Sequence, residues 1–218
     1  MTTDELIEAV KAGDESRVRE LAPQHPDARD ENGVSALMLS RYYGTPPDVT
    51  SALRDARSEI DVFEAATLGD TERLRELLDA DASLAHAWSP DRGTALHFAV
   101  FFGQPETAAL LLERGADVHA VSPTFGDVTP LHSAAAASSY STELVHLLLE
   151  AGADPNARQG GGFTALHAAA QNGDVAMAAD LLERGADPGA ANDDGRTALS
   201  IAEEQGHADV ATLLRQRL

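Results

Sequence analysis

Short apolar runs recur along this chain, and each is followed at the same distance by a glycine. The leucine runs at residues 110–112, 147–149 and 181–182 precede Gly-Ala-Asp triplets that begin three residues after the last leucine. An apolar run flanked by polar and charged residues is typical of a helix with one buried face. The glycine favours a left-handed cap, which ends a helix. The pattern therefore predicts three equivalent helices, each ended by its glycine.

A second pattern stands before each of these runs. Residues 94–97, 129–132 and 164–167 read Thr-x-Leu-His, and residues 197–200 keep the threonine and the leucine. These segments begin 35, 35 and 33 residues apart. The threonine hydroxyl can cap a helix, and a proline in the next position suits its first turn. The chain is therefore predicted to repeat a unit of two helices, a short first helix and the apolar second one.

The unit can be followed toward the N-terminus in a more divergent form. Residues 35–38 keep a capping serine and a leucine, residues 60–69 keep the alanines and glycine of a first helix, and residues 4–21 form a polar pair. The starting points 4, 35, 60, 94, 129, 164 and 197 predict seven helix pairs. The step of 25 residues from 35 to 60 leaves no room for the usual loop or hairpin. We therefore expect the row of repeats to lack one such finger there, or to bend.

Residues 129–134, Thr-Pro-Leu-His-Ser-Ala, match the signature T-P-L-H-x-A of the ankyrin repeat. With a period close to 33 residues, the chain resembles the ankyrin-repeat family over essentially its whole length, in particular small stand-alone bacterial ankyrin proteins. The resemblance implies an all-α solenoid of about seven helix-turn-helix repeats, with short loop or hairpin fingers and a concave groove. We expect a single domain over 1–218, with repeats at approximately 1–31 (cap), 32–58, 59–90, 91–123, 124–160, 161–193 and 194–218 (cap).

Composition and charge indicate the cellular compartment and limit the classes of partner. The chain has no long apolar run and no signal-peptide pattern, so we expect a cytoplasmic protein without a membrane partner. It has no cysteine, which excludes disulfides and thiolate metal sites. Its formal net charge is −20, from 36 acidic and 16 basic residues spread over both halves. The charge argues against nucleic acid as a partner and leaves two readings open, a self-repelling soluble surface or a basic partner.

Three histidines occupy the same position in successive repeats and could suggest a metal site or a catalytic site. His97, His132 and His167 would form a ladder along the stack, and in the family this position is structural. No tight pair of histidines with metal-ligand spacing occurs, and paired carboxylates such as 193–194 are typical of solvated turns. We therefore predict no catalytic residue, no metal and no cofactor. An unrecognised enzyme, motivated by the ladder alone, is kept as a hypothesis that buried and backbone-bonded rings would remove.

Aromatic residues stand where the repeat does not require them. The two positions before each first-helix glycine tend to face the groove in the family, and rings occupy these positions in the first half of the chain. Exposed rings are favoured binding anchors because they bury a large area at low entropic cost. The alternative is that a ring packs against the neighbouring repeat. The candidate partner-binding residues are Tyr42, Tyr43, Trp88, Phe101, Phe102, Phe125 and Phe163.

The leading hypothesis is a non-catalytic, monomeric protein-protein interaction module. A partner protein, for which the acidity favours a basic surface, would lie in the concave groove and against the finger tips. The alternative is an acidic decoy or inhibitor of a nucleic-acid-binding protein. That alternative needs carboxylates that gather on one face.

Overall fold

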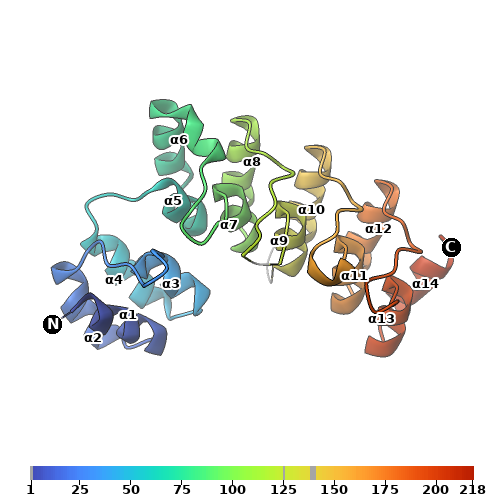
Figure 1. Cartoon of the computed structure of the whole chain (residues 1–218), viewed down its shortest axis with the longest axis horizontal. Helices are drawn as coiled ribbons and strands as arrows, with labels where there is room; N and C mark the ends of the chain where they lie inside the picture. The colour runs from blue at the N-terminus through green and yellow to red at the C-terminus, as the bar shows by residue number, and fades with distance from the viewer. Residues whose placement is uncertain (1, 125, 138–140) are drawn as a thin grey trace.

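The computed structural model describes residues 2–124, 126–137 and 141–218, and these form a row of helix pairs (Figure 1). The first helices are α1 (Thr3–Ala12), α3 (Ala36–Tyr42), α5 (Val62–Leu68), α7 (Ala95–Phe101), α9 (Pro130–Ala136), α11 (Ala165–Asn172) and α13 (Ala198–Gln205). The second helices are α2 (Glu15–Leu21), α4 (Pro47–Ala56), α6 (Thr71–Ala80), α8 (Pro105–Glu113), α10 (Ser141–Glu150), α12 (Val175–Glu183) and α14 (Ala208–Arg215). Short 3-10 turns are η1 (Ala22–Gln24), η2 (Ala82–His86) and η3 (Gly160–Gly162). The predicted all-α solenoid of seven helix pairs is confirmed.

The first helices begin where the threonine pattern predicts. The threonines before α7, α9, α11 and α13 have extended backbone, and each donates its N–H to the side chain three residues on. Before α7 and α13 the threonine hydroxyl also accepts an N–H of the first turn. Backbone donors that a helix start leaves without a partner are thereby satisfied. The Thr-x-Leu pattern thus determines where these helices begin.

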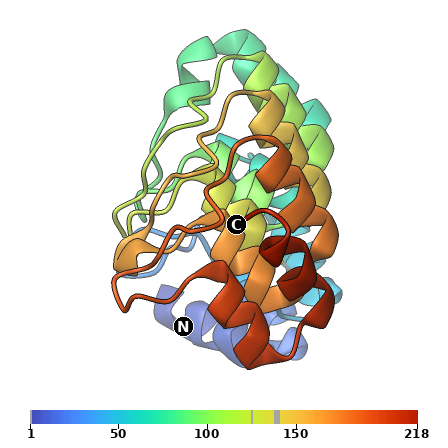
Figure 2. The ribbon, with the colours of Figure 1, turned by 90° about the vertical axis from the view of Figure 1, so that its right-hand side faces the viewer.

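The apolar faces of the pairs join into one continuous core. Leu96, Leu131 and Leu166 of the first helices are fully buried, as are the leucines at corresponding places in α8, α10 and α12. A single pair leaves its apolar face open on both sides, so only its neighbours can cover it. The view along the row shows the helices stacked on one side and the loops on the other (Figure 2).

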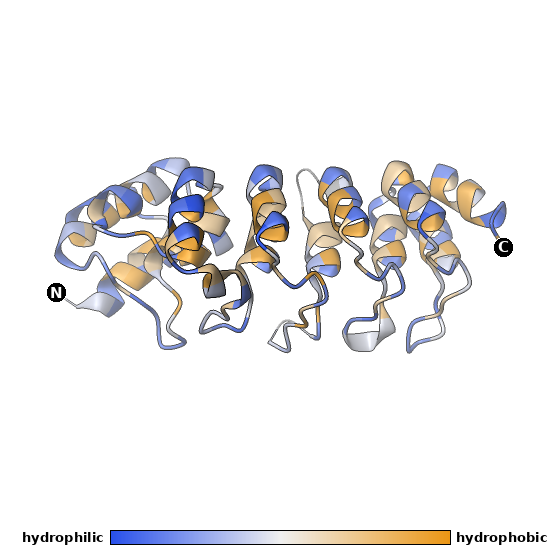
Figure 3. Cartoon of the chain, turned by 90° about the horizontal axis from the view of Figure 1, so that it is seen from above, coloured by the Kyte–Doolittle hydropathy of each residue, from blue (hydrophilic) through white to orange (hydrophobic). Residues whose placement is uncertain are grey.

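The loops before the first helices form fingers that project to the same side of the row (Figure 3). Four fingers are closed by one antiparallel bridge each, at Arg29–Ser35, Trp88–Thr94, Ser122–Val128 and Ala191–Thr197. In a fifth, the N–H of Gln159 donates to the carbonyl of Phe163 at 2.9 Å. Residues 57–61 instead run directly from α4 to α5 without a finger. This agrees with the short step in the repeat spacing.

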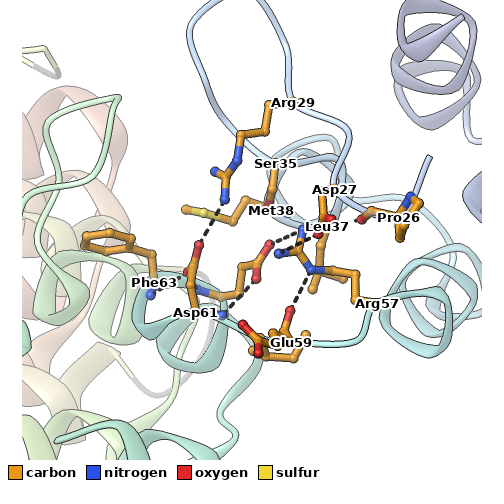
Figure 4. Close-up of polar contacts among 12 residues, drawn as sticks. Pro26, Asp27, Arg29, Ser35, Leu37, Met38, Arg57, Glu59, Asp61 and Phe63 are labelled. Carbon is orange, nitrogen blue, oxygen red and sulfur yellow. Dashed lines mark hydrogen bonds and ion pairs between the residues drawn. The ribbon is translucent and has the colours of Figure 1, made fainter. Parts of the chain in front are cut away.

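A buried ion pair occupies the place of the missing finger (Figure 4). A guanidinium nitrogen of Arg57, which is only 6% exposed, lies 3.0 Å from a carboxylate oxygen of the fully buried Glu64. Arg57 also donates to the carbonyl of Glu59 at 3.0 Å, and its guanidinium lies 3.6 Å from Asp27. Burial raises the pKa of Glu64, as does the charge of Asp61, while Arg57 opposes that rise. Polar contacts therefore join α1–α4 to the rest of the row at this point.

Because residues 57–61 form no finger, the fingers before α3 and α7 lie against each other. Gly33, in the finger before α3, has a left-handed backbone (φ +82°), and a Cβ there would lie 3.1 Å from Pro90 in the finger before α7. Farther along, backbone hydrogen bonds join the fingers before α9, α11 and α13, and Arg158 of the finger before α11 also donates to the carbonyl of Ala191 at 2.9 Å. The N–H of Gly160 donates to the carbonyl of Gly126 at 2.6 Å, and the N–H of Asp193 donates to that of Gly161 at 3.0 Å. The fingers before α3 and α7 thus lie against each other, and the fingers before α9, α11 and α13 are connected in turn.

Replacing Arg57 by methionine is expected to lower the free energy of unfolding by about 3–5 kcal/mol, because it leaves a buried carboxylate without its cation. Stability in a solenoid is nearly a sum of neighbour interfaces, so the amides of α1–α4 should exchange with solvent faster while those of α11–α14 do not change. Urea unfolding and hydrogen exchange measure both effects. The control is Arg54→Met, which removes the more exposed pair with Asp70 across the same junction and should cost about 1 kcal/mol or less. Equal losses in the two variants would contradict the assignment.

Gly173→Ala is expected to cost more than Gly185→Ala, although both glycines have left-handed backbone (φ +70° and +92°). Alanine pays the backbone strain, roughly 1–3 kcal/mol, at either position. At Gly173 the new Cβ would also lie 2.6 Å from the ring of His207, whose Nε2–H donates to the carbonyl of Gln171 at 3.0 Å. At Gly185 nothing lies within 4 Å. Urea unfolding of the two variants gives the difference, and identical values would show that the ring contact contributes nothing.

Candidate functional site

The histidine ladder holds neighbouring repeats together. Nε2 of His97, His132 and His167 lies 3.1, 3.0 and 3.1 Å from the carbonyls of Val128, Ala157 and Arg196. A carbonyl only accepts, so Nε2 carries the proton in each ring. Nδ1 in turn accepts the backbone N–H of the threonine three residues earlier. Nε2 therefore joins one repeat to the finger of the next, while Nδ1 bonds the start of its own helix.

This bonding also keeps the rings neutral. All three are buried, and burial lowers the pKa of His97, His132 and His167 below the ordinary value of 6.5. A second proton would have to sit on Nδ1, which already faces the N–H of the preceding threonine. Both nitrogens of each ring are bonded to backbone, so the hypothesis of an enzyme that uses these histidines has no support. In the described part of the chain, no group of three or more His, Asp or Glu side chains is arranged to hold a metal ion.

The structure divides the candidate aromatic residues by exposure. Tyr43, Trp88 and Phe101 are 54%, 48% and 44% exposed. Tyr42, Phe102 and Phe163 are partly buried and pack against the core. Phe125 lies outside the described residues. The two readings that the sequence left open, contact surface and packing, therefore apply to different members of the set.

The partly buried rings bridge the gap left by the missing finger. Tyr42 of α3 packs against Phe98 of α7 and against Phe102, the residue that caps α7, with ring centroids 6.5 and 5.4 Å apart, and so reaches past α5 to the fourth helix pair. Phe63 of α5 meets Phe98 edge-on at 6.0 Å. Phe101 packs edge-on against Phe102 at 5.1 Å while keeping its outer side exposed. The rings form a cluster that supports one exposed aromatic at its edge.

Beside this cluster the concave face is hollowed. A cavity of about 210 Å³ is lined by Tyr42 from α3, by His97, Phe98 and Phe101 of α7, and by His132 and Ala136 of α9. Phe98 and the histidines are buried, whereas Phe101 and Ala136 are exposed. Trp88 stands next to it, since its ring centroid lies 6.3 Å from that of His97. Two of the three exposed aromatic candidates, Trp88 and Phe101, thus adjoin one apolar hollow.

One carboxylate is held at this hollow by neutral donors. The Tyr42 hydroxyl donates to Asp91 at 2.8 Å, and the Ser89 hydroxyl donates to its other oxygen. Burial and the charge of Asp91 both raise the pKa of the Tyr42 phenol, which therefore stays a neutral donor. Sequence reasoning did not select Asp91, because a short finger residue carries no signal until its neighbours are known. The repeat phase predicts that Ala136 faces the groove, but only rings at such positions were candidates.

Three other carboxylates recur along the stack at one phase of the repeat. The aspartates of the three Gly-Ala-Asp triplets, Asp117, Asp154 and Asp187, each accept the N–H two residues ahead at 2.9 Å. They are exposed, and they recur once per repeat after α8, α10 and α12. An aspartate that bonds its own backbone in this way shapes a turn. These three carboxylates are therefore part of the repeat itself.

Comparison with known proteins agrees with the geometry. A family model described as "Ankyrin repeats (3 copies)" matches residues 6–122, 62–159 and 131–217. The chain belongs to the ankyrin-repeat family. Ankyrin repeats generally mediate protein-protein interaction and are typically non-catalytic modules. None of the helices in the described segments has the length and apolar character needed to cross a lipid bilayer.

Curated ankyrin-containing relatives match only part of this chain. The probable E3 ubiquitin-protein ligase XBOS31 of Oryza sativa subsp. japonica is 42% identical over 130 residues, which are 56% of this chain and 27% of that protein. The B-cell lymphoma 3 protein homolog of Mus musculus is 45% identical over 80 residues, 37% of this chain and 17% of the relative. Ankyrin repeat and SOCS box protein 5 of Mus musculus is 43% identical over 99 residues, which are 44% of this chain and 27% of that protein. The chain spans between 17% and 27% of these relatives.

The ankyrin histidines are expected to make stability fall on acidification. Below the ordinary histidine pKa of 6.5 the unfolded chain binds protons that the buried rings do not bind, so the free energy of unfolding decreases as the pH falls from 7. Each ring contributes a slope of up to about 1.4 kcal/mol per pH unit. Urea unfolding between pH 7.5 and 5.5, values chosen to be about one unit either side of that pKa, measures the slope.

His132→Gln is the variant that isolates one ring, because its slope against pH should be smaller than that of the wild-type chain. The difference between the two slopes removes the contribution of other groups, Glu64 among them. His86→Gln, at an exposed histidine, serves as the control and should leave the slope as it is. A His132→Gln slope equal to that of the wild type would contradict the account.

Proposed function

We propose that this ankyrin-repeat chain is a non-catalytic module that binds a partner protein across its concave face, with Trp88 and Phe101 at the centre of the contact. The observation that carries the proposal is the exposure of these two rings, 48% and 44%, beside the same apolar hollow. Aromatic side chains beside a pocket often contribute a large share of the binding free energy at a protein-protein interface.

The rigidity of the surface favours this use. Phe101 is supported by Phe102, which packs against Tyr42, and the fingers before α9, α11 and α13 are joined by backbone hydrogen bonds. A preformed surface loses little conformational entropy when a partner binds. Tyr43, which caps the C-terminal end of α3 and follows Tyr42 of the lining, is a further exposed ring.

The double variant Trp88→Ala/Phe101→Ala is expected to lose the partner. The tagged chain is used to capture proteins from a lysate of its source, and bound proteins are identified by mass spectrometry. Removal of two anchors, each worth more than about 1 kcal/mol, should reduce recovery at least tenfold. Circular dichroism checks that the fold is intact.

Val175→Ala is the matched control, because Val175 is 39% exposed at the start of α12, a second helix. Its partner recovery should equal that of the wild-type chain. Full recovery by a folded double variant would sink the assignment of the contact to these rings.

A further inference from the structure

The hollow beside Phe101 has a size that limits what can enter it. Its volume is about 210 Å³, below the roughly 300–1,000 Å³ of pockets that hold cofactors and drug-sized ligands. An apolar cavity of about 150 Å³ is large enough for benzene. The hollow therefore fits one aromatic or branched aliphatic group.

We propose that this hollow takes a single large apolar side chain from a segment of the partner protein, and that the same segment presents a lysine or arginine to Asp91. The inference rests on the proposed function, because it assumes that the partner lies on the concave face. It goes further by naming the chemistry of the segment. The occupant is a protein segment, and neither a small molecule nor a second copy of this chain is required.

The lining supports the apolar half of the proposal. Phe98 is 2% exposed and Tyr42 is partly buried, and together with Phe101 they present ring surfaces to the hollow. His97 and His132 also line it, but both rings are neutral and have their nitrogens bonded to backbone. The walls therefore offer contact area and no charge.

One glycine makes room for this lining. A Cβ on Gly93 would lie 2.5 Å from the end of the Phe98 ring. The finger can thus pass close to that ring only because residue 93 has no side chain. The position of the hollow is set by this close approach of a finger to α7.

Asp91 supports the charged half. Tyr42 lines the hollow, and its hydroxyl donates to this carboxylate at 2.8 Å, so the charge is held by a residue of the lining. Its two hydrogen-bond donors, the hydroxyls of Tyr42 and Ser89, are neutral. In the described ranges, no lysine or arginine nitrogen lies within 4.0 Å of Asp91. The net charge of −20 adds a general attraction for a cationic segment.

The edge of the hollow can also hold the backbone of such a segment. Gln159, in the finger before α11, lines the cavity, and its side-chain amide makes no hydrogen bond to another described residue. An amide can both donate to a carbonyl and accept from an N–H. An extended segment that passes over the hollow would find this pairing group beside its buried side chain.

The test uses random 12-residue peptides displayed on phage, selected against the wild-type chain in its full length. Enriched peptides are expected to share a phenylalanine, tryptophan, leucine or isoleucine with a lysine or arginine within two positions. The absence of enriched peptides, or enriched peptides without this pair, would overturn the proposal. Synthetic forms of the enriched peptides then serve as probes in fluorescence anisotropy.

Three variants separate the two halves of the site. Ala136→Trp fills the mouth of the hollow and should weaken peptide binding by about tenfold or more. Asp91→Asn should weaken it by about two- to fivefold and reduce its dependence on salt, as the loss of one exposed ion pair does. Arg92→Gln, the neighbouring finger position, is the matched control and should not weaken binding. Binding to Ala136→Trp at wild-type strength would overturn the proposal.

The outcome can be told apart from that of the proposed function. If the Trp88→Ala/Phe101→Ala variant loses the captured partner while Ala136→Trp keeps it, the concave face binds a partner but the hollow does not take its side chain. If the wild-type chain associates with itself in sedimentation experiments and Ala136→Trp abolishes that association, the occupant is a second copy and the inference is wrong.

Discussion

The hydrogen bond from a histidine ring to the carbonyl of the next finger is the interaction on which the regular part of the stack depends. It is formed three times at nearly the same length, 3.0–3.1 Å, because the three rings stand at one phase of the repeat. The threonine before each helix fixes the tautomer that can make it. The bond sets where each finger stands, and the fingers in turn define the concave face.

The site arises where this regularity fails. Residues 57–61 supply no finger, and the gap is closed by the Arg57–Glu64 pair and by a bridge of rings from Tyr42 to α7. That bridge brings Tyr42 to one side of the hollow that Phe101 lines on another. A missing loop has thus placed aromatic area and the carboxylate of Asp91 beside each other, in a stack whose other first-helix ends are mostly small or polar.

Much of the architecture could be predicted because ankyrin structure is set by local patterns. The Thr-x-Leu segments predicted the starts of α7, α9, α11 and α13, and the glycines after the leucine runs predicted the ends of the second helices. The short spacing before residue 60 predicted the missing finger. The candidate aromatics were harder to interpret, since nothing in the spacing distinguishes Phe101, which is exposed, from Phe102, which packs against Tyr42.

The sequence by itself determined the family, the seven helix pairs and the phase that makes the histidines structural, because caps, glycines and apolar periods act over a few residues. Tertiary structure alone decided which rings stay exposed, where the hollow forms and that Asp91 stands beside it. These depend on which side chains meet across repeats, 30 to 60 residues apart along the chain, as Tyr42 meets Asp91 and Phe102. Such contacts follow from how the helix pairs pack across the missing finger, whereas the repeat spacing indicates only that the finger is missing.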